Sequence, residues 1–225
     1  MKDTGYALKN TELFEKGHSL AEKQIFECEY PWQVLPHIKA IILEIGKTLP
    51  ADRYDNPSEG VWMAKSAKVS PSASISGPCI IGEDTEIRQC AFIRGSALVG
   101  DGCVIGNSTE LKNCIISDCC QVPHFNYVGD SILGYKSHMG AGSITSNVKS
   151  DKTLVCVRAG EERIETGLKK FGAMLGDFVE VGCNSVLNPG TVIGSHSNVY
   201  PLSSVRGAVP ANSIFKAAGN IVPKK

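Results

Sequence analysis

The chain has 225 residues, of which 42% are hydrophobic, so it is long enough to bury a core of its own. Its 23 lysines and arginines balance 23 aspartates and glutamates, which excludes a whole-chain field that would attract nucleic acid or an anionic membrane. Residues 1–4 lack a signal-peptide pattern, and the longest apolar run, residues 40–43, is too short to span a membrane. We therefore expect a cytoplasmic protein with neither a nucleic-acid nor a membrane partner.

Nine cysteines are present, an odd number, and Cys119 and Cys120 are adjacent. This pattern does not suit an ordinary disulfide framework, so a reducing compartment fits best. The chain has no C-x-x-C pair, which argues against a structural zinc site, and no metal is expected.

Residues 1–60 are expected to form a helical N-terminal cap. After the stretch PWQVL at 31–35, apolar residues recur at helical spacing before Pro50: Ile38, Ile42, Ile45 and Leu49. We expect this helix to act as a lid over the open end of the domain that follows, rather than to take part in catalysis.

A repeat organises residues 61–207. An aliphatic residue or methionine returns every six positions, with a smaller residue two positions before it: Met63, Val69, Ile75, Ile81, Ile87, Ile93, Val99, Ile105 and Leu111. Two five-residue steps shift the series to Ile116 and later to Leu133, and it resumes at Leu175 after an interruption. Both positions are expected to point into one narrow interior.

A period of six matches neither an amphipathic helix nor a plain alternating strand, but it suits short strands joined by tight corners. The pattern resembles the hexapeptide-repeat acyltransferases. That resemblance implies a mainly β fold, a left-handed parallel β-helix with three flat faces per coil of roughly eighteen residues. Its register places Cys79 and Cys103 at the small inward position, where a free cysteine acts as a buried hydrophobe, and Cys183 in or near a similar position.

Residues one coil apart should lie above one another at roughly 4.8 Å. Arg94 and Lys112 are such a pair, since each directly follows an inward aliphatic residue. Two stacked cations become favourable when an anion such as phosphate lies between them, although a solvated edge explains them equally well.

The same register places His124 outward, one layer from Ala141 in Gly140-Ala141-Gly142. The glycines let a ligand approach the backbone, whose N–H groups could support an oxyanion. Tyr127 lies on the same face, next to the corner of Arg94 and Lys112. The spacing of the repeat thus predicts that a potential base, a strip of backbone donors and a cationic corner lie close to one another.

The stretches at 124–130 (HFNYVGD) and 140–145 (GAGSIT), followed by Asn147, are similar to the acetyltransferase domain of the bifunctional N-acetylglucosamine-1-phosphate uridyltransferase/glucosamine-1-phosphate acetyltransferase. The similarity covers residues 65 to 207. It implies an amino-sugar N-acetyltransferase of nucleotide-sugar biosynthesis with acetyl-CoA as co-substrate. It also implies a homotrimer with the acyl-CoA groove between subunits.

The resemblance also implies roles for individual residues. His124 matches the general base, and the residues matching substrate contacts are Arg94, Lys112, Tyr127, His138 and Asn147. The acyl-CoA groove would pass Ala141, Cys183 and Pro201. Two departures concern the substrate: the family has asparagine at His138, and its Asn-Tyr-Asp-Gly is replaced here by NVKS at 147–150.

The interruption at 146–172 is an excursion from the repeat, and an insertion of this size is often functional. Residues 208–225 are expected to form a C-terminal tail outside the β-helix. Residues 1–60 are too few for the family's uridyltransferase domain and hold no glycine-rich nucleotide loop, so uridylyl transfer is not expected.

Two alternatives remain. A metal-dependent hydratase of the same fold would need three converging histidines, and the repeat contains only His124, His138 and His196. A catalytically silent trimeric sugar-phosphate-binding or scaffold protein would keep the cationic corner without turnover.

Overall fold

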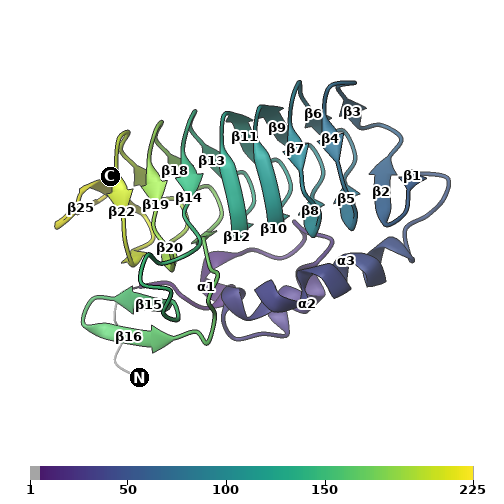
Figure 1. Ribbon diagram of the computed structural model, residues 1–225. Coiled ribbons are helices and arrows are strands. Elements are labelled where there is room, and N and C mark those ends of the chain that lie inside the picture. The colour runs from purple at the N-terminus through teal and green to yellow at the C-terminus, as the bar shows by residue number, and fades with distance from the viewer. Residues whose placement is uncertain (1–5, 225) are drawn as a thin grey trace.

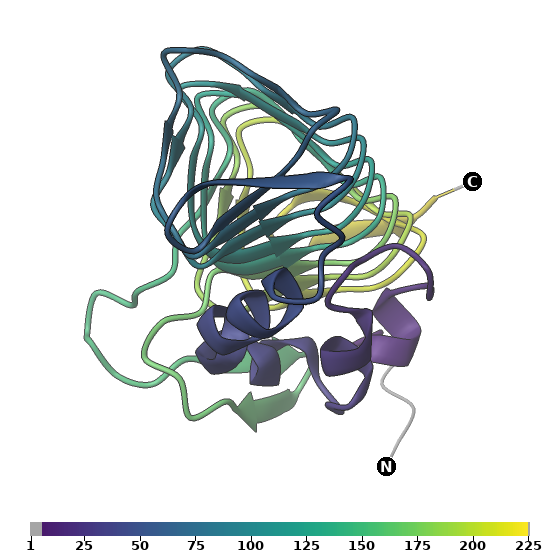
Figure 2. The same ribbon diagram turned by 90° about the vertical axis from the view of Figure 1, so that its right-hand side faces the viewer.

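The computed structural model describes residues 6–224. Most of these residues form a β-helix of three flat faces, which has a triangular outline when viewed along its axis (Figure 2). The strands stack in parallel within each face, so the predicted parallel β-helix is confirmed.

Two faces belong to one 14-stranded sheet, because the long strands β10 (Glu110–Ile116) and β12 (Tyr127–Leu133) continue around the corner between them. Face 1 contains the second halves of these two strands together with β2 (Val61–Ala64), β5 (Cys79–Ile81), β8 (Ala97–Val99), β17 (Ala173–Leu175), β20 (Thr191–Ile193) and β23 (Ala208–Val209). Face 2 contains their first halves with β4 (Ser74–Ile75), β7 (Phe92–Ile93), β14 (Ile144–Thr145), β19 (Val186–Leu187) and β22 (Ser204–Val205).

Face 3 is a separate nine-stranded sheet. Its strands are β3 (Lys68–Val69), β6 (Glu86–Ile87), β9 (Val104–Asn107), β11 (Gln121–His124), β13 (His138–Met139), β18 (Glu180–Val181), β21 (Asn198–Val199), β24 (Ser213–Ala217) and β25 (Asn220–Pro223). At the two ends of the stack the pairing reverses: β1 (Tyr54–Ser58) pairs antiparallel with β2, and β25 pairs antiparallel with β24.

The interior of the β-helix is the predicted one. The aliphatic repeat residues and the smaller residues before them form one buried cluster, and Cys79 and Cys103 are fully buried within it. Burial raises the pKa of the Cys79 thiol. Both cysteines therefore pack as small apolar residues, as predicted.

The N-terminal segment covers face 1 rather than the open end of the first coil. Its helices are α1 (Asn10–Leu13), α2 (Glu22–Phe26), the 3-10 helix η1 (Pro31–His37) and α3 (Ile38–Gly46). Helix α3 packs against β5, β8 and β10, and η1 packs against β12 (Figure 1). The expected lid over the first coil is therefore wrong. Outward apolar residues on face 1, such as Leu98 and Ile115, need this lateral cover, and both are fully buried.

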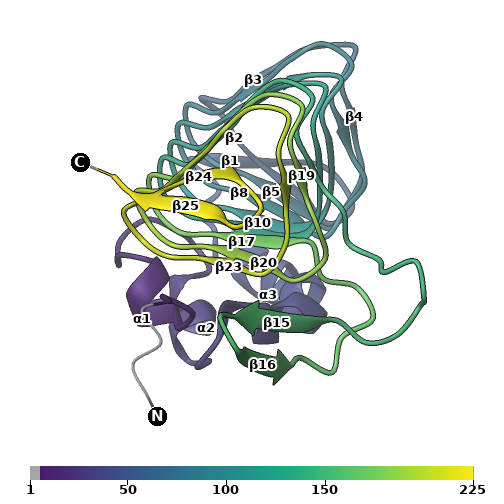
Figure 3. The same ribbon diagram turned by 90° about the vertical axis from the view of Figure 1, so that its left-hand side faces the viewer.

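The excursion at 146–172 returns to the same face. It forms an antiparallel hairpin of β15 (Cys156–Ala159) and β16 (Glu162–Glu165), which lies beside β20 and β23 (Figure 3). Val155, Val157 and Phe171 join the apolar cluster beneath the helices, and the Phe171 ring lies 5.7 Å from that of Trp32. The N-terminal segment and the excursion thus form one lateral layer.

The β-helix continues past residue 207, so the expected boundary of a tail at 208 is wrong. β23 stacks on β20, and β24 stacks on β21. Val209 and Phe215 are buried in the interior cluster. Among residues 6–224, no helix is both long enough and apolar enough to cross a membrane.

Candidate active site

His124 ends β11 at the corner between faces 3 and 2, here called the His124 corner. Val122 and Pro123 are buried, whereas His124, at the end of the strand, is exposed to solvent. The backbone is firmly held: the His124 N–H donates to Oδ1 of Asn126 at 3.0 Å, and the Asn126 amide donates to the Gly140 carbonyl at 2.8 Å. Within residues 6–224, no side chain hydrogen-bonds the His124 ring.

The register places Ala141 beside His124, as predicted, because Gln121 pairs with His138 three positions earlier in each strand. The Gly142 N–H donates to the His124 carbonyl at 3.0 Å. Cys183 and Pro201 follow in the next two coils, since the Asn184 N–H donates to Ala141 and the Leu202 N–H to Cys183. Cys183 is exposed at this corner, so its expected near-inward position is wrong.

A second group of polar residues lies at the corner between faces 2 and 1, here called the Lys112 corner. Lys112 Nζ lies 3.2 Å from Oδ2 of Asp130, whose side chain is buried. The Asn147 amide donates to Asp130 and, at 3.2 Å, to the Tyr127 hydroxyl. The structure therefore brings Lys112, Tyr127 and Asn147 together around a carboxylate.

The electrostatics of this corner raise the pKa of Tyr127 above its ordinary value. Burial is the main cause, and the Asp130 carboxylate adds to it, while the hydrogen bond from Asn147 acts in the opposite direction. Tyr127 is therefore a neutral hydroxyl donor at neutral pH.

Arg94 precedes Lys112 at the same corner, since its N–H donates to the Leu111 carbonyl at 2.9 Å. Its guanidinium lies 2.7 Å from Oε1 of Glu110, which raises the pKa of Arg94 by hydrogen bonding and charge. Each stacked cation therefore has its own carboxylate partner. The predicted stacking is present, and the charges of the pair are already compensated by Glu110 and Asp130.

His138 is not brought to either group. It opens β13 on face 3, where its Nδ1 lies 2.7 Å from Oε2 of Glu180 in the next coil. His124 and Lys112 also lie at opposite edges of face 2, with Tyr127 on the strand between them. On one chain the predicted site residues are therefore divided among the His124 corner, the Lys112 corner and His138 on face 3.

Sequence reasoning missed the carboxylates Glu110, Asp130 and Glu180. Asp130 ends the recognised stretch 124–130, and Glu110 lies two positions before Lys112 on the same strand. A cation with a carboxylate on an outward position of the same or the adjacent coil is the signal that would have found them.

The three histidines of the repeat stay apart, because His196 stacks on Phe178 at 4.7 Å at the corner between faces 1 and 3. Within the described residues 6–224, no cluster of three histidine, cysteine, aspartate or glutamate side chains could hold a metal ion. The three converging histidines that the metal-dependent alternative needs are therefore not found within residues 6–224 of one chain.

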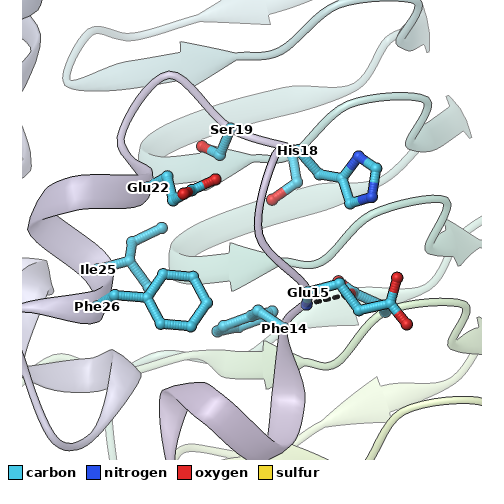
Figure 4. Close-up of a pocket in the computed structure, with 9 residues that line it drawn as sticks. Phe14, Glu15, His18, Ser19, Glu22, Ile25 and Phe26 are labelled. Carbon is cyan, nitrogen blue, oxygen red and sulfur yellow. Dashed lines mark hydrogen bonds between the residues drawn. The ribbon is translucent and has the colours of Figure 1, made fainter.

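A pocket between the N-terminal segment and the coils has a structural role (Figure 4). Asp177 is one of its lining residues, and the Asp177 carboxylate accepts the N–H groups of Glu15 at 2.6 Å and Tyr135 at 2.7 Å. Burial raises the pKa of Asp177. Phe14 and Phe26 line the pocket beside it. This contact fastens the N-terminal segment to the β-helix.

Comparisons with known proteins agree with the resemblance read from the sequence. The family model described as the GMPPB C-terminal domain matches residues 75–208. A bifunctional sugar-1-phosphate nucleotidylyltransferase/acetyltransferase of Sulfurisphaera tokodaii is 34% identical over 102 residues, 45% of this chain and 25% of that protein. The bifunctional protein GlmU of Methanococcus vannielii is 31% identical over 159 residues, 71% of this chain.

The chain spans only 34% of the length of that GlmU protein. Among solved structures, the acetyltransferase domain of PglB from Neisseria gonorrhoeae, in complex with acetyl coenzyme A, has a TM-score of 0.38 at 16% identity. That comparison covers 73% of this chain and 57% of the other.

Proposed function

The chain belongs to the GMPPB C-terminal domain family, and from this premise we propose that it is an acetyl-CoA-dependent N-acetyltransferase acting on a phosphorylated amino sugar such as glucosamine 1-phosphate. The observation that carries the proposal is the stacking of His124 beside Ala141, Cys183 and Pro201. The names of the relatives from Sulfurisphaera tokodaii and Methanococcus vannielii support it.

In the proposed reaction His124 is the general base. It removes the proton from the sugar amine as nitrogen attacks the thioester carbonyl. When the tetrahedral intermediate collapses, the C–S bond breaks, and the proton held by His124 passes to the departing thiolate. A new C–N bond and free CoA are the products.

The backbone N–H of Ala141 is the proposed oxyanion donor. The N–H groups of Gly140 and Gly142 already bond to Val181 and His124, at 2.7 and 3.0 Å. No acceptor within residues 6–224 takes the N–H of Ala141, so this donor on the strip is free to meet an oxyanion. The small side chains of Ala141 and Cys183 leave the backbone accessible to the acyl-CoA.

Arg94 and Lys112 are the proposed phosphate ligands, with Tyr127, His138 and Asn147 as further substrate contacts. The phosphate would draw the two cations away from Glu110 and Asp130, which hold them in the free protein. His138 and His124 lie apart on one chain, so the proposal includes a homotrimer with the acyl-CoA groove between subunits. Sedimentation measures the oligomeric state directly.

We place the protein in the cytoplasm. All nine cysteines are free, including the adjacent pair Cys119 and Cys120, which supports a reducing compartment.

The test is release of free CoA thiol from acetyl-CoA with glucosamine 1-phosphate, and with other amino-sugar phosphates as alternative acceptors. In His124→Gln the rate should fall by roughly 10²–10⁴. His37→Gln is the matched control, because His37 is exposed on η1 and should leave the rate unchanged. Equal rates in wild type and His124→Gln would refute the assignment of the base.

The second candidate is a catalytically silent sugar-phosphate-binding protein. The His124 ring without an orienting partner and the two compensated cations favour it. If wild type binds glucosamine 1-phosphate in calorimetry, loses that binding in Lys112→Ala, and releases no thiol with any acceptor, this candidate replaces the enzyme.

A further inference from the structure

Four cationic side chains line a small cavity where the excursion meets the last coils: Lys149, Arg158, Arg163 and Arg206. This cavity is here called the basic pocket. Its other lining residues are Cys156, Pro189 and Gly207, so no carboxylate lines it. Its volume of about 60 Å³ is several times the space that one water molecule needs.

The positive charge of the basic pocket is only partly compensated. Arg158 on β15 and Arg163 on β16 lie directly opposite each other in the antiparallel hairpin. Like charges at such positions destabilise a pair of strands. Arg163 has an ion pair with Glu165 at 2.9 Å, whereas Arg158 has no carboxylate partner within residues 6–224.

The other two cations add to this surplus. Arg206 donates to the neutral amide oxygen of Asn188 at 3.1 Å and has no ion pair within the described part of the chain. Lys149 lies 3.3 Å from Asp151, whose side chain is 56% exposed and lies outside the pocket lining. A bound anion would therefore relieve repulsion that the protein's own residues leave in place.

Close backbone packing holds the hairpin of β15 and β16 against the last coils. A Cβ atom at Gly207 would lie 2.7 Å from the Arg158 carbonyl oxygen, and one at Gly190 would lie 2.7 Å from that of Cys156. The hairpin's inward residues Val157 and Ala159 are buried against face 1. Strand β15, which carries Arg158, therefore packs beside β23, which Arg206 precedes in the chain (Figure 3).

The basic pocket is separate from the proposed sugar-phosphate ligands. Lys112 and Arg206 occupy equivalent corner positions, with Gly129, Ser146 and Asn188 in the coils between them. Four coil steps correspond to roughly 19 Å at the spacing of parallel strands. One phosphate group cannot contact both places.

We propose that the basic pocket binds the phosphate groups of a phosphorylated small molecule at a second site. Arginine guanidinium groups bind phosphate oxygens through two parallel hydrogen bonds, and three arginines line this pocket, two from the hairpin and one from the corner before β23. The proposal stands independently of the acetyltransferase function, because it uses no residue assigned to that reaction.

The test is calorimetric titration of the full chain with inorganic pyrophosphate. Inorganic phosphate and ADP are titrated separately, to tell whether a single phosphate suffices and whether a nucleoside adds affinity. The double variant Arg158→Gln/Arg206→Gln should weaken pyrophosphate binding by at least about tenfold, since it removes two charge-assisted contacts. Arg206→Gln alone, at an exposed side chain, serves if the double variant does not fold.

Two controls make the result specific. Lys152→Gln/Lys169→Gln removes two exposed charges from the same excursion outside the pocket lining and should leave the affinity within about twofold. Lys112→Ala should also leave it unchanged. Absence of saturable binding to wild type, equal loss in the two double variants, or loss of binding in Lys112→Ala would each overturn the proposal.

Discussion

Lys112 and Asp130 form an ion pair in which the carboxylate is buried and the ammonium group is partly exposed, with side-chain exposures of 5% and 26%. Asn113 and Asn147 also donate to the same carboxylate. In Asp130→Asn, an amide donor would face these three donors. We expect the free energy of unfolding, measured in urea, to fall by roughly 1–3 kcal/mol.

The control for this prediction is Asp151→Asn, which removes the exposed partner of Lys149. A surface pair of this kind contributes about 0–1 kcal/mol. The structural role of Asp130 would be contradicted if both variants lost the same amount.

Ile115→Ala tests the lateral cover of face 1. The side chain points out of the β-helix and is nevertheless fully buried beneath the N-terminal segment. Its truncation should lower the free energy of unfolding by roughly 2–5 kcal/mol, as in an ordinary core. Leu202→Ala, at a side chain that is 79% exposed, should change it by less than about 0.5 kcal/mol. A negligible effect at Ile115 would mean that the helices do not pack there in solution.

Gly190→Ala tests the docking of the excursion. Gly190 has φ +82°, and a Cβ atom there would meet the carbonyl of Cys156 and the side chain of Val155. Gly167 has a similar φ of +72° with open space around it, so Gly167→Ala reports the backbone strain alone. Thermal and urea unfolding should show Gly190→Ala to be less stable than Gly167→Ala by at least about 1 kcal/mol. Similar losses would argue against a docked hairpin.

The pH dependence of stability should contain a contribution from Asp177. Burial raises its folded-state pKa above the value of 3.8 for an unperturbed carboxyl, so the folded state binds a proton more readily than the unfolded state. Stability from this group is therefore present below pH 3.8 and is lost as pH rises through the raised pKa.

Asp177→Asn removes this titration, but its single amide oxygen can replace only one of the two carboxylate oxygens that accept the N–H groups of Glu15 and Tyr135. The variant should therefore be less stable at every pH, and the slope against pH is the informative quantity. Urea midpoints measured across that pH range should decline less steeply with rising pH in the variant than in wild type. Parallel curves would show that Asp177 titrates normally in the folded protein.

The inward repeat predicted the parallel stacking and the positions of His124 beside Ala141 and of Arg94 before Lys112. It could not predict the last coil, because the step from Val205 to Val209 has four residues instead of six. Gly207, at φ +81°, closes that shortened corner. A strict six-residue count therefore loses the register where the β-helix continues.

The helix at 38–46 was predictable from the spacing of its apolar residues, but its packing against face 1 was not predicted. The signal was present in adjacent apolar pairs such as Leu98-Val99 and Ile115-Ile116, where one side chain points inward and its neighbour outward. A strand with apolar residues on both sides is buried on both sides. The carboxylate partners at the candidate site were missed for a related reason, because they occupy outward positions, which the inward repeat does not specify.

The antiparallel strands at the two ends of the stack have a consequence for assembly. A parallel β-helix that ended on a bare coil would offer a row of backbone donors and acceptors to the next molecule, the geometry from which fibres grow. Here β1 and β25 reverse direction over the terminal strands, and each carries a proline, Pro57 and Pro223, that has no N–H to donate. Each end is thereby a poorer template for end-to-end growth along the face that its antiparallel strand covers, which is face 1 at β1 and face 3 at β25.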